Sequence, residues 1–497
     1  MFPEFTLRYA HFPERFHTRF DPVPVKSPRL VAFNRPLAEE LGFDLIAFDA
    51  TLATDWFSGN RVPEGAAPLA QAYAGHQFGH FNPRLGDGRA VLLGEVTDGE
   101  GRLRDIQLKG AGCTPFSRGG DGRAPLGPVL REYLISEAMQ VLGVPTTRAL
   151  AAVTTGERVI RGVPVPGAVL TRVASSHLRI GTFQFFAAQG DSEAVKRLAD
   201  HAIERHYPAL ADIASPGERY LALFEAVQAR QAVLVARWMG LGFIHGVMNT
   251  DNASIAGETI DYGPCAFMER YDPATVFSSI DEGGRYAYTN QPWIAQWNLA
   301  RFAETLLPLI DDDQQRGIDR ATEVLKTYAA VYEAEWLAVM RAKLGLSEAA
   351  AGSDSADRGL IESLLEAMHT GRADFTLTFR RLCDAAEGEG HESELVALFE
   401  RAEPIQAWVA EWRQRLAREG VAVGEIAQQM RAVNPAYIPR NHRVEAALAA
   451  AIDEEDFAPF ERLMQVLARP FEERAEHADY AQPAPPTAQV FRTFCGT

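Results

Sequence analysis

The segment HGVMNTDN at residues 245–252, followed by TIDYG at 259–263, decides the fold of this chain. Apolar residues recur at helical spacing over 217–241, which predicts a long helix leading into this segment. Asp251, Asn252 and Asp261 supply three oxygen-bearing side chains, and hard divalent cations such as Mg2+ take such ligands while leaving positions for substrate phosphates. Alone, Asp-Asn is typical of an Asx turn and Asp-Tyr-Gly of a hairpin, so the upstream sequence has to decide between these interpretations.

A β-hairpin is predicted upstream, with strands over 89–96 and 102–109 joined by the turn sequence TDGEG. Lys109 ends the second strand, where its ammonium group is costly to bury without an anionic partner. The alternative is that its side chain extends to solvent.

A helix is predicted over 128–142, and it offers two possible partners for the strand lysine. Glu132 lies near its N-terminus and could face back towards the strand, whereas Glu137 lies on a different face. A strand lysine paired with a helix glutamate is how kinase-like folds fix the lysine against ATP phosphates.

Three further segments combine glycines with charged side chains in a way that suits phosphate binding. They are LGDGR at 85–89 with Gly86, Gly88 and Arg89, RGGDGR at 118–123 with Asp121 and Gly122, and the stretch after residue 169 with Arg172 and Arg179. Taken singly, each has an ordinary alternative: a tight turn, a flexible surface loop, or surface ion pairs. They become informative only together with the loop at 245–263.

These elements in this order predict an α+β chain with a protein-kinase-like bilobal fold, in which a small β-rich lobe precedes a larger helical lobe. Short β-rich runs at 147–153 and 168–173 would complete the small lobe, helical patterns dominate 292–470, and residues 349–357 and the tail from Gln482 have loop composition. We expect four parts: an irregular N-terminal extension with short helices (1–80), the small lobe (81–175), the helical lobe with the catalytic and metal-binding loops (176–345), and a helical C-terminal extension with the tail (346–497).

One position departs from the protein-kinase pattern. In protein kinases an Asp two residues after the loop His accepts the proton of the substrate hydroxyl, and the metal-binding Asn lies five residues further on. Here Val247 occupies that position, and the only acid before Asn252 within the loop is Asp251. The chain is therefore expected to be either a nucleotide binder without activity or an enzyme with different chemistry on the same nucleotide.

The composition of the 497 residues narrows the possible partners and compartment. Acidic residues exceed basic ones by 66 to 49, for a net charge of −17, which argues against nucleic acid as the main partner. The four cysteines show no CxxC spacing, as expected in a reducing compartment, and no apolar run is long enough to cross a bilayer. We expect a cytoplasmic protein that binds neither nucleic acid nor membrane.

Six longer blocks closely resemble the selenoprotein O family (SelO, also called YdiU), a group of kinase-like proteins. The blocks are 71–90, 108–124, 170–184, 245–252, 260–264 and 279–292, and the resemblance covers nearly the whole chain. It implies a protein adenylyltransferase that binds ATP in an orientation reversed from that in ordinary kinases. Such an enzyme transfers AMP to Ser, Thr or Tyr hydroxyls of proteins with Mg2+ or Mn2+, and self-modification is expected.

The resemblance also implies a role for each candidate residue. Asp251 matches the proton acceptor, Asn252 and Asp261 match the metal ligands, and Glu132 matches the partner of Lys109. The positions that match nucleotide contacts are Gly86, Gly88, Arg89, Lys109, Asp121, Gly122, Arg172, Arg179 and Asp261; among them Lys109, Arg172 and Arg179 match the residues that hold the outer phosphates.

Three alternatives stay open at this point: a regulatory nucleotide binder, a true kinase that uses Asp251 as base, and transfer of UMP from UTP. The cysteine pattern departs from the family's, because eukaryotic members have a Cys-x-x-selenocysteine near the C-terminus and here Cys495 stands without a neighbouring partner. We expect Cys495 to be an ordinary tail thiol. Cys113 beside the glycine-rich loop is a second redox candidate, and Cys265 is expected to serve packing.

Overall fold

The predicted hairpin forms the centre of the sheet. The computed structural model describes residues 2–347, 354–388, 390–485 and 492–493. In it, β7 (Ala90–Thr97) and β8 (Leu103–Lys109) pair antiparallel, and Ala90 lies opposite Lys109. The nine-stranded sheet has the order β2-β4-β7-β8-β11-β10-β3, with β1 on β7 and β9 on β11. The other strands are β1 (Phe5–Thr6), β2 (His17–Arg19), β3 (Arg29–Phe33), β4 (Leu69–Gln71), β9 (Ala124–Pro125), β10 (Arg148–Arg161) and β11 (Val163–Ala174).

The runs predicted as short strands at 147–153 and 168–173 are the two ends of one long hairpin, β10–β11, which turns at Gly162 with φ +75°. Register shifts near Ala149 and Thr154 interrupt the alternation of buried and exposed residues in β10. The outer part of the hairpin also exposes apolar side chains such as Ile160. A strand is predicted from the alternation of apolar and polar residues that a buried face imposes. The outer part of the hairpin lacks this alternation, so the sequence does not predict it.

The first 80 residues contain the expected short helices, α1 (Arg35–Glu40) and α2 (Ala50–Ser58). They are less irregular than predicted, because β1 to β4 all join the sheet. These strands are two to five residues long and pair with distant segments, so local sequence carries little signal for them. The boundaries predicted near residues 80, 175 and 345 stay predictions.

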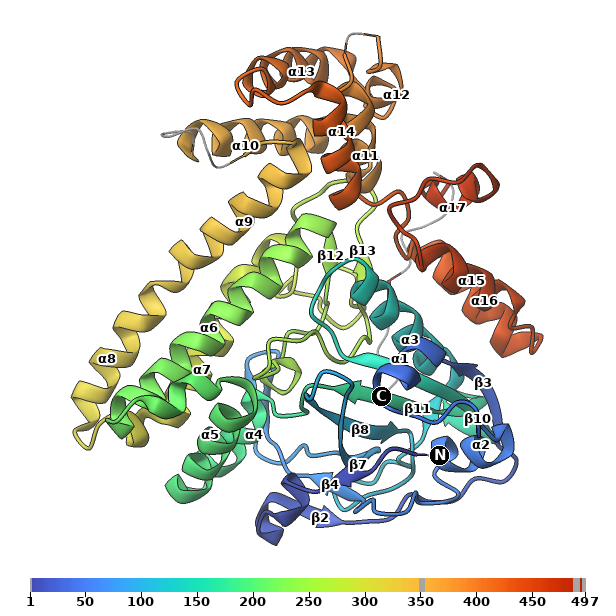
Figure 1. Ribbon diagram of the computed structural model, residues 1–497, viewed down its shortest axis with the longest axis vertical. Coiled ribbons are helices and arrows are strands. Elements are labelled where there is room, and N and C mark those ends of the chain that lie inside the picture. Colours follow the sequence, from blue (N-terminus) through green and yellow to red (C-terminus); the bar gives the residue numbers. More distant parts are fainter. Residues whose placement is uncertain (1, 348–353, 389, 486–491, 494–497) are drawn as a thin grey trace.

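The predicted helix at 128–142 is α3 (Leu126–Val141), which begins two residues earlier and is buried over most of its length. It packs against β10 and β11 on one side and against the C-terminal helices α15 (Asn441–Asp453) and α16 (Ala458–Leu467) on the other. The C-terminal helices α15 and α16 thus return to α3, the helix that packs on the sheet (Figure 1).

The long helix predicted at 217–241 is confirmed as α6 (Pro216–Leu241), and Gly242 ends it in the left-handed conformation. It packs between α7 (Gln291–Ile310) and α9 (Tyr328–Leu344). The other helices of this region are α4 (Ile180–Ala187), α5 (Ser192–His206) and α8 (Gln314–Lys326), and the short pair β12 (Phe243–Ile244) and β13 (Ala266–Phe267) lies next to the loop at 245–263.

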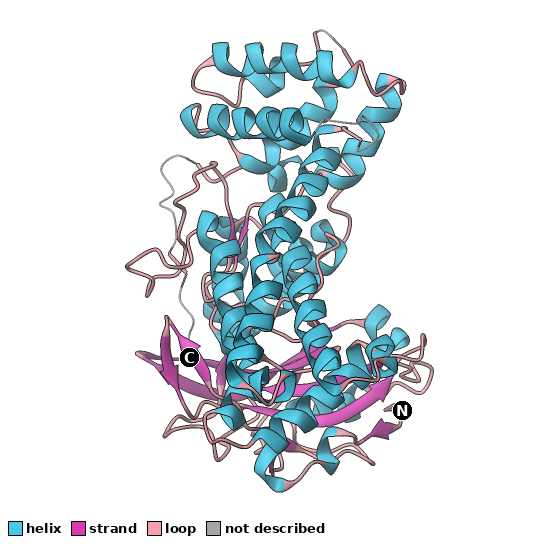
Figure 2. Cartoon of the chain, turned by 90° about the vertical axis from the view of Figure 1, so that its left-hand side faces the viewer, coloured by secondary structure: helices cyan, strands magenta, loops and turns pink. Residues whose placement is uncertain are grey.

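Helices dominate the C-terminal region as predicted: α10 (Asp354–Thr370), α11 (Phe375–Ala385), α12 (Ser393–Val396), α13 (Ala402–Leu416), α14 (Val423–Val433), then α15, α16 and α17 (Ala478–Ala481). Figure 2 shows the strands at one end of the molecule and the helices extending away from them. Among the described residues, none of these helices combines the length and the apolar character needed to cross a bilayer.

The prediction of a loop at 349–357 is wrong for residues 354–357. Residues 348–353 lie outside the described residues, but 354–357 belong to α10. Asp357 is buried there between Arg341 and Arg415, at 2.8 and 2.7 Å. Two guanidinium groups neutralise this carboxylate, so a polar composition that is typical of a surface loop is compatible with a packed helix.

Candidate active site

A cavity of about 860 Å³ lies where the sheet, α3, the loop at 245–263 and α15 meet. All twelve residues singled out in the sequence line it: Gly86, Gly88, Arg89, Lys109, Asp121, Gly122, Glu132, Arg172, Arg179, Asp251, Asn252 and Asp261. Their side chains come from segments up to 175 positions apart in the sequence, so only the fold brings them together. Their individual roles stay predictions.

Three cations converge on Asp261. Its Oδ1 atom accepts hydrogen bonds from Lys109 Nζ at 2.8 Å and Arg172 Nη1 at 2.7 Å, and its Oδ2 atom accepts one from Arg179 Nη1 at 2.8 Å. Although burial alone would raise the pKa of this carboxyl, Lys109, Arg172 and Arg179 hold it well below its usual range. Asp261 also has φ +64°, a left-handed conformation that costs energy for a residue other than glycine and that is concentrated at functional sites.

Glu132, not Glu137, is the helix partner of Lys109. Glu132 Oε2 accepts from Lys109 Nζ at 2.6 Å, and its Oε1 accepts from Arg172 Nη1 at 3.1 Å. Glu137 instead forms an ion pair with Arg148 at 2.8 Å. Within the ion pairs of this cluster three cations face two carboxylates. The carboxylates of Asp87 and Asp251 lie near Arg179 in the same cavity.

Asp251 is another acid of the cavity, and its pKa is shifted in the direction opposite to that of Asp261. Burial raises its pKa to about 6, although the nearby Arg179 acts to lower it. Its Oδ2 atom accepts a long hydrogen bond from Gln77 Nε2 at 3.3 Å, while its Oδ1 atom is buried and has no hydrogen-bond partner among the described residues. Arg179 donates to the backbone carbonyl of Asp251 at 2.9 Å and so links this loop to Asp261.

Oxygen atoms suited to a hard cation remain at this end of the cavity. The Asn252 amide group donates to the Val247 carbonyl at 2.9 Å, and its own oxygen accepts no hydrogen bond from a described residue. Together with the partnerless Oδ1 of Asp251 and the carboxylate of Asp261, this donor set fits Mg2+ or Mn2+. Among the described residues no cluster of three or more His, Cys, Asp or Glu side chains is arranged to hold a metal, so an ion here would depend on an amide and on waters or phosphates as well.

The glycine-rich loops close tightly over the cavity. Gly86 has φ +64° and a Cβ there would overlap the ring of Phe116; Gly122 has φ +65° and a Cβ there would overlap the backbone of Gly112 and Cys113. Backbone is thereby exposed to the cavity at positions where side chains cannot fit. Asp121 in the second loop lines the cavity, and Arg161 pairs with its carboxylate through two hydrogen bonds of 2.8 Å.

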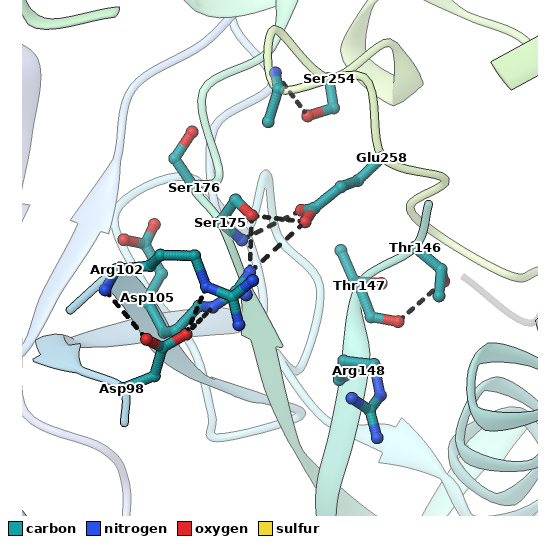
Figure 3. A network of polar contacts seen from close by, with 12 residues as sticks. Asp98, Arg102, Asp105, Thr146, Thr147, Arg148, Ser175, Ser176, Ser254 and Glu258 are labelled. Atoms are coloured by element: carbon teal, nitrogen blue, oxygen red, sulfur yellow. Dashed lines mark hydrogen bonds and ion pairs between the residues drawn. The ribbon is translucent and has the colours of Figure 1, made fainter. Parts of the chain in front are cut away.

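A polar network behind the cavity fixes the segment that leads to Asp261. Glu258 accepts from the backbone N–H of Ser175 at 3.0 Å and from its hydroxyl at 2.6 Å, and Arg104 donates to the same hydroxyl at 2.7 Å (Figure 3). Thr259 pairs with the backbone at residues 145–147. The loop bearing the shared carboxylate is therefore attached to the sheet from both sides.

Sequence reasoning missed several lining residues. Tyr73 places its ring beneath the Arg179 guanidinium at 4.7 Å, Gln77 contacts Asp251, and Arg161 anchors the second glycine loop. Tyr73 and Gln77 lie within the block 71–90, where a family-wide comparison of sequences could have found them. Arg161 is the last residue of β10, beside the turn of the β10–β11 hairpin, and no local sequence pattern indicates its role.

Of the cysteines, Cys113 is exposed and donates from its Sγ to the Gly120 carbonyl at 3.1 Å. Cys265 is fully buried, which raises the pKa of its thiol to about 12 and confirms its packing role. Cys495 lies outside the described residues.

The chain is similar to known proteins over nearly its whole length. Residues 3–468 match the model of a family described as protein adenylyltransferase SelO. A protein named protein nucleotidyltransferase YdiU from Rhizobium etli (strain CIAT 652) is 58% identical over 493 residues, covering 99% of this chain and 97% of that protein. The protein of the same name from Cereibacter sphaeroides (strain ATCC 17029) is 60% identical over 495 residues, covering 99% of both.

The chain is thus an enzyme of the protein nucleotidyltransferase class, built on an antiparallel sheet with a helical C-terminal region. Within that class it belongs to the SelO family of protein adenylyltransferases.

Proposed function

We propose that this enzyme transfers AMP from ATP to Ser, Thr or Tyr hydroxyls of proteins, including its own, and releases pyrophosphate. The proposed architecture is a kinase-like bilobal one with the nucleotide bound between the sheet and the helical part. One arrangement supports this most directly. A single cavity contains three cationic side chains suited to phosphate oxygens, the Asp261 carboxyl with a pKa well below its usual range, and the Asp251 carboxyl with a pKa of about 6.

The cations suit a pyrophosphate leaving group. When the acceptor oxygen bonds to the α-phosphorus, the bond from this phosphorus to the bridging oxygen of the β-phosphate breaks, and negative charge develops on the departing pyrophosphate. Lys109, Arg172 and Arg179 can neutralise that charge if they exchange part of their contact with Asp261 for phosphate oxygens.

Asp251 suits the acceptor hydroxyl. A carboxylate with a pKa near 6 is ionised at neutral pH and still basic enough to take a proton in the transition state. Its buried, partnerless Oδ1 is an acceptor atom to which a hydroxyl could donate. The proton of the hydroxyl would pass to this oxygen as the new phosphorus–oxygen bond forms.

Asn252 and Asp261 would hold a Mg2+ or Mn2+ ion beside these groups. Such an ion supplies charge neutralisation on the phosphate oxygens when it is bound. Orientation of the hydroxyl and acceptance of its proton belong to Asp251, and fixation of the outer phosphates belongs to the three cations.

The decisive experiment compares incubations with Mg2+, a generic protein substrate and ATP labelled at the α- or the γ-phosphate. Label on protein from the α-position alone supports AMP transfer, and the same assay with α-labelled UTP tests UMP transfer as the alternative. Label from the γ-position alone would mean a kinase. No label, with ATP still raising the melting temperature, would favour a regulatory nucleotide binder, for which Val247 is the main argument.

A further inference from the structure

A short β-hairpin within the block 71–90 packs directly on the loop that bears Asp251. It consists of β5 (Gly75–Gln77) and β6 (His80–Asn82). The His76 N–H donates to Thr250 Oγ1 at 2.7 Å and the Phe78 N–H donates to Asn249 Oδ1 at 3.1 Å. A Cβ at Gly75 would overlap the Asp251 side chain, so the hairpin and the loop form one unit.

The outer side of this hairpin continues into a surface of aromatic and arginine side chains. The Phe81 ring contacts His76 at a tilt of 46°, with 4.9 Å between ring centroids, and His76 meets the Trp297 ring edge-on at 5.3 Å. Arg285 and Arg301 lie over the Trp297 ring at 4.8 and 5.3 Å. We call Phe81, Arg285, Trp293, Trp297 and Arg301 the aromatic–arginine patch.

Two members of the patch are exposed well beyond what packing requires. Trp293 is 58% exposed and Phe81 is 40% exposed. Exposed tryptophan and arginine together are characteristic of surfaces that bind other polypeptides. The patch is also continuous with the candidate active site, because Tyr286, next to Arg285 in the sequence, donates to Asn249 Oδ1 at 2.7 Å and Gln77 lines the cavity.

Arg285 is the member with unmet charge. It forms no ion pair with any described residue, whereas Arg301 is paired with Glu304 at 2.6 Å. Of the two acids that precede it, Glu282 forms no ion pair with a described residue, and Asp281 accepts hydrogen bonds from the backbone N–H groups of Arg285 and Tyr286. Stacking of a guanidinium on an indole uses its face and leaves its edge to hold a carboxylate through two hydrogen bonds.

We propose that the aromatic–arginine patch binds the acceptor polypeptide, and that Arg285 selects acceptor segments with an Asp or Glu side chain close to the modified hydroxyl. This inference rests on the proposed transfer to protein hydroxyls. The net charge of −17 makes such selectivity local, because the chain as a whole repels acidic partners and only a specific contact with Arg285 can favour them.

The test uses the full-length enzyme with ATP, Mg2+ and two acceptor peptides that differ only in one residue, Glu or Gln, beside the hydroxyl. Because a hydrogen bond to a charged group contributes about 1.5 kcal/mol or more, we expect a KM about tenfold lower for the Glu peptide. Arg285→Gln should abolish this preference with little change in kcat. Trp293→Ala should raise KM for both peptides alike.

Arg301→Gln is the matched control, because Arg301 stacks on the same tryptophan but already has a carboxylate partner. It should keep the preference for Glu. Equal KM values for the two peptides with the unaltered enzyme, or a full preference that survives in Arg285→Gln, would overturn the inference. Competition by a single-stranded oligonucleotide but not by the acidic peptide would also overturn it, in favour of a nucleic-acid surface.

Failure of the proposed function is distinguishable from failure of this inference. If the unaltered enzyme transfers no AMP to any acceptor, the quenching of tryptophan fluorescence by the two peptides still measures binding. Stronger binding of the Glu peptide that is lost in Arg285→Gln would then support the patch alone, and equal binding of both peptides would refute it.

Discussion

Replacement of Asp261 by Asn tests whether the three cations of the cavity depend on one carboxylate. The substitution keeps the size of the side chain and removes its charge. Lys109 and Arg172 retain Glu132 as a partner, but Arg179 loses the only carboxylate with which it forms an ion pair among the described residues. Three cations would then face a single carboxylate.

The expected cost follows from burial. Removal of one partner from a buried ion pair destabilises by about 3–5 kcal/mol. The Asp261 side chain is 20% exposed and Glu132 compensates two of the three cations, so we expect the lower end, about 3 kcal/mol. Because the folded-state pKa of Asp261 is depressed, its contribution is present above the unfolded-state pKa, about 3.9, and is lost only as the pH falls through the lower folded-state value. The difference between the two proteins should therefore persist from pH 5 to pH 8.

The assay is urea unfolding followed by tryptophan fluorescence, with and without tripolyphosphate, in EDTA so that no divalent cation takes part. The polyanion should stabilise Asp261→Asn more than the unaltered protein, since it supplies the missing negative charge to the same cations. The matched control is Asp357→Asn, which also leaves two buried arginines short of a carboxylate but lies in α10 rather than in the cavity. That variant should lose stability and gain nothing extra from tripolyphosphate. Unchanged stability of Asp261→Asn, or equal rescue of both variants, would refute the reasoning.

Two further substitutions test the packing and the glycine loop. Lys343 is buried with its ammonium 4.2 Å from the Phe379 ring centroid, and burial lowers its pKa to about 7. Between pH 7 and 10 the unfolded chain then binds more protons than the folded one, so the free energy of unfolding should rise with pH over this range. Lys343→Met should remove this pH dependence and raise the free energy of unfolding by about 2 kcal/mol at pH 7, a value that allows for the lost cation–π contact. Urea unfolding at several pH values measures both effects. Gly122→Ala should lower ATP affinity about tenfold in calorimetry, a loss of about 1.4 kcal/mol, because the loop must move away from the backbone of Gly112. Gly119→Ala, with φ +84° but no atom within 4 Å of its Cβ, should have a much smaller effect, and equal losses would show that φ rather than the clash matters.

The elements that the sequence predicted well are those with strong local signals. The β7–β8 hairpin has a turn of glycine and acidic residues between two apolar runs, and α6 has 26 residues of helical periodicity that end at Gly242. Buried faces impose such periodicity on the sequence directly. The first four strands lack it because they are two to five residues long and pair with distant segments; β4 is buried but has only three residues. The outer half of β10–β11 lacks it because its faces are only partly buried.

The site was predicted unevenly for a similar reason. Some residue types have few structural uses at a given place, such as a lysine that ends an apolar strand or an Asp-Asn pair after a long helix. Such residues can be predicted as site residues from the sequence alone. Gln77, Arg161 and Arg285 are unremarkable in sequence and become informative only through what they contact, namely Asp251, Asp121 and the Trp297 indole. Chemistry can be inferred from residue type, whereas positioning requires the fold.

The arrangement around Asp261 has a consequence that neither the residue types nor their order could indicate. Lys109, Arg172 and Arg179 were expected to face phosphates, yet all three donate hydrogen bonds to the Asp261 carboxylate. Phosphate binding must therefore compete with these internal ion pairs. A nucleotide with a short phosphate chain gains little from this exchange, while a triphosphate can contact all three cations at once. On the proposed function, selectivity for a triphosphate over a monophosphate would thus originate in three cations that one carboxylate holds close together.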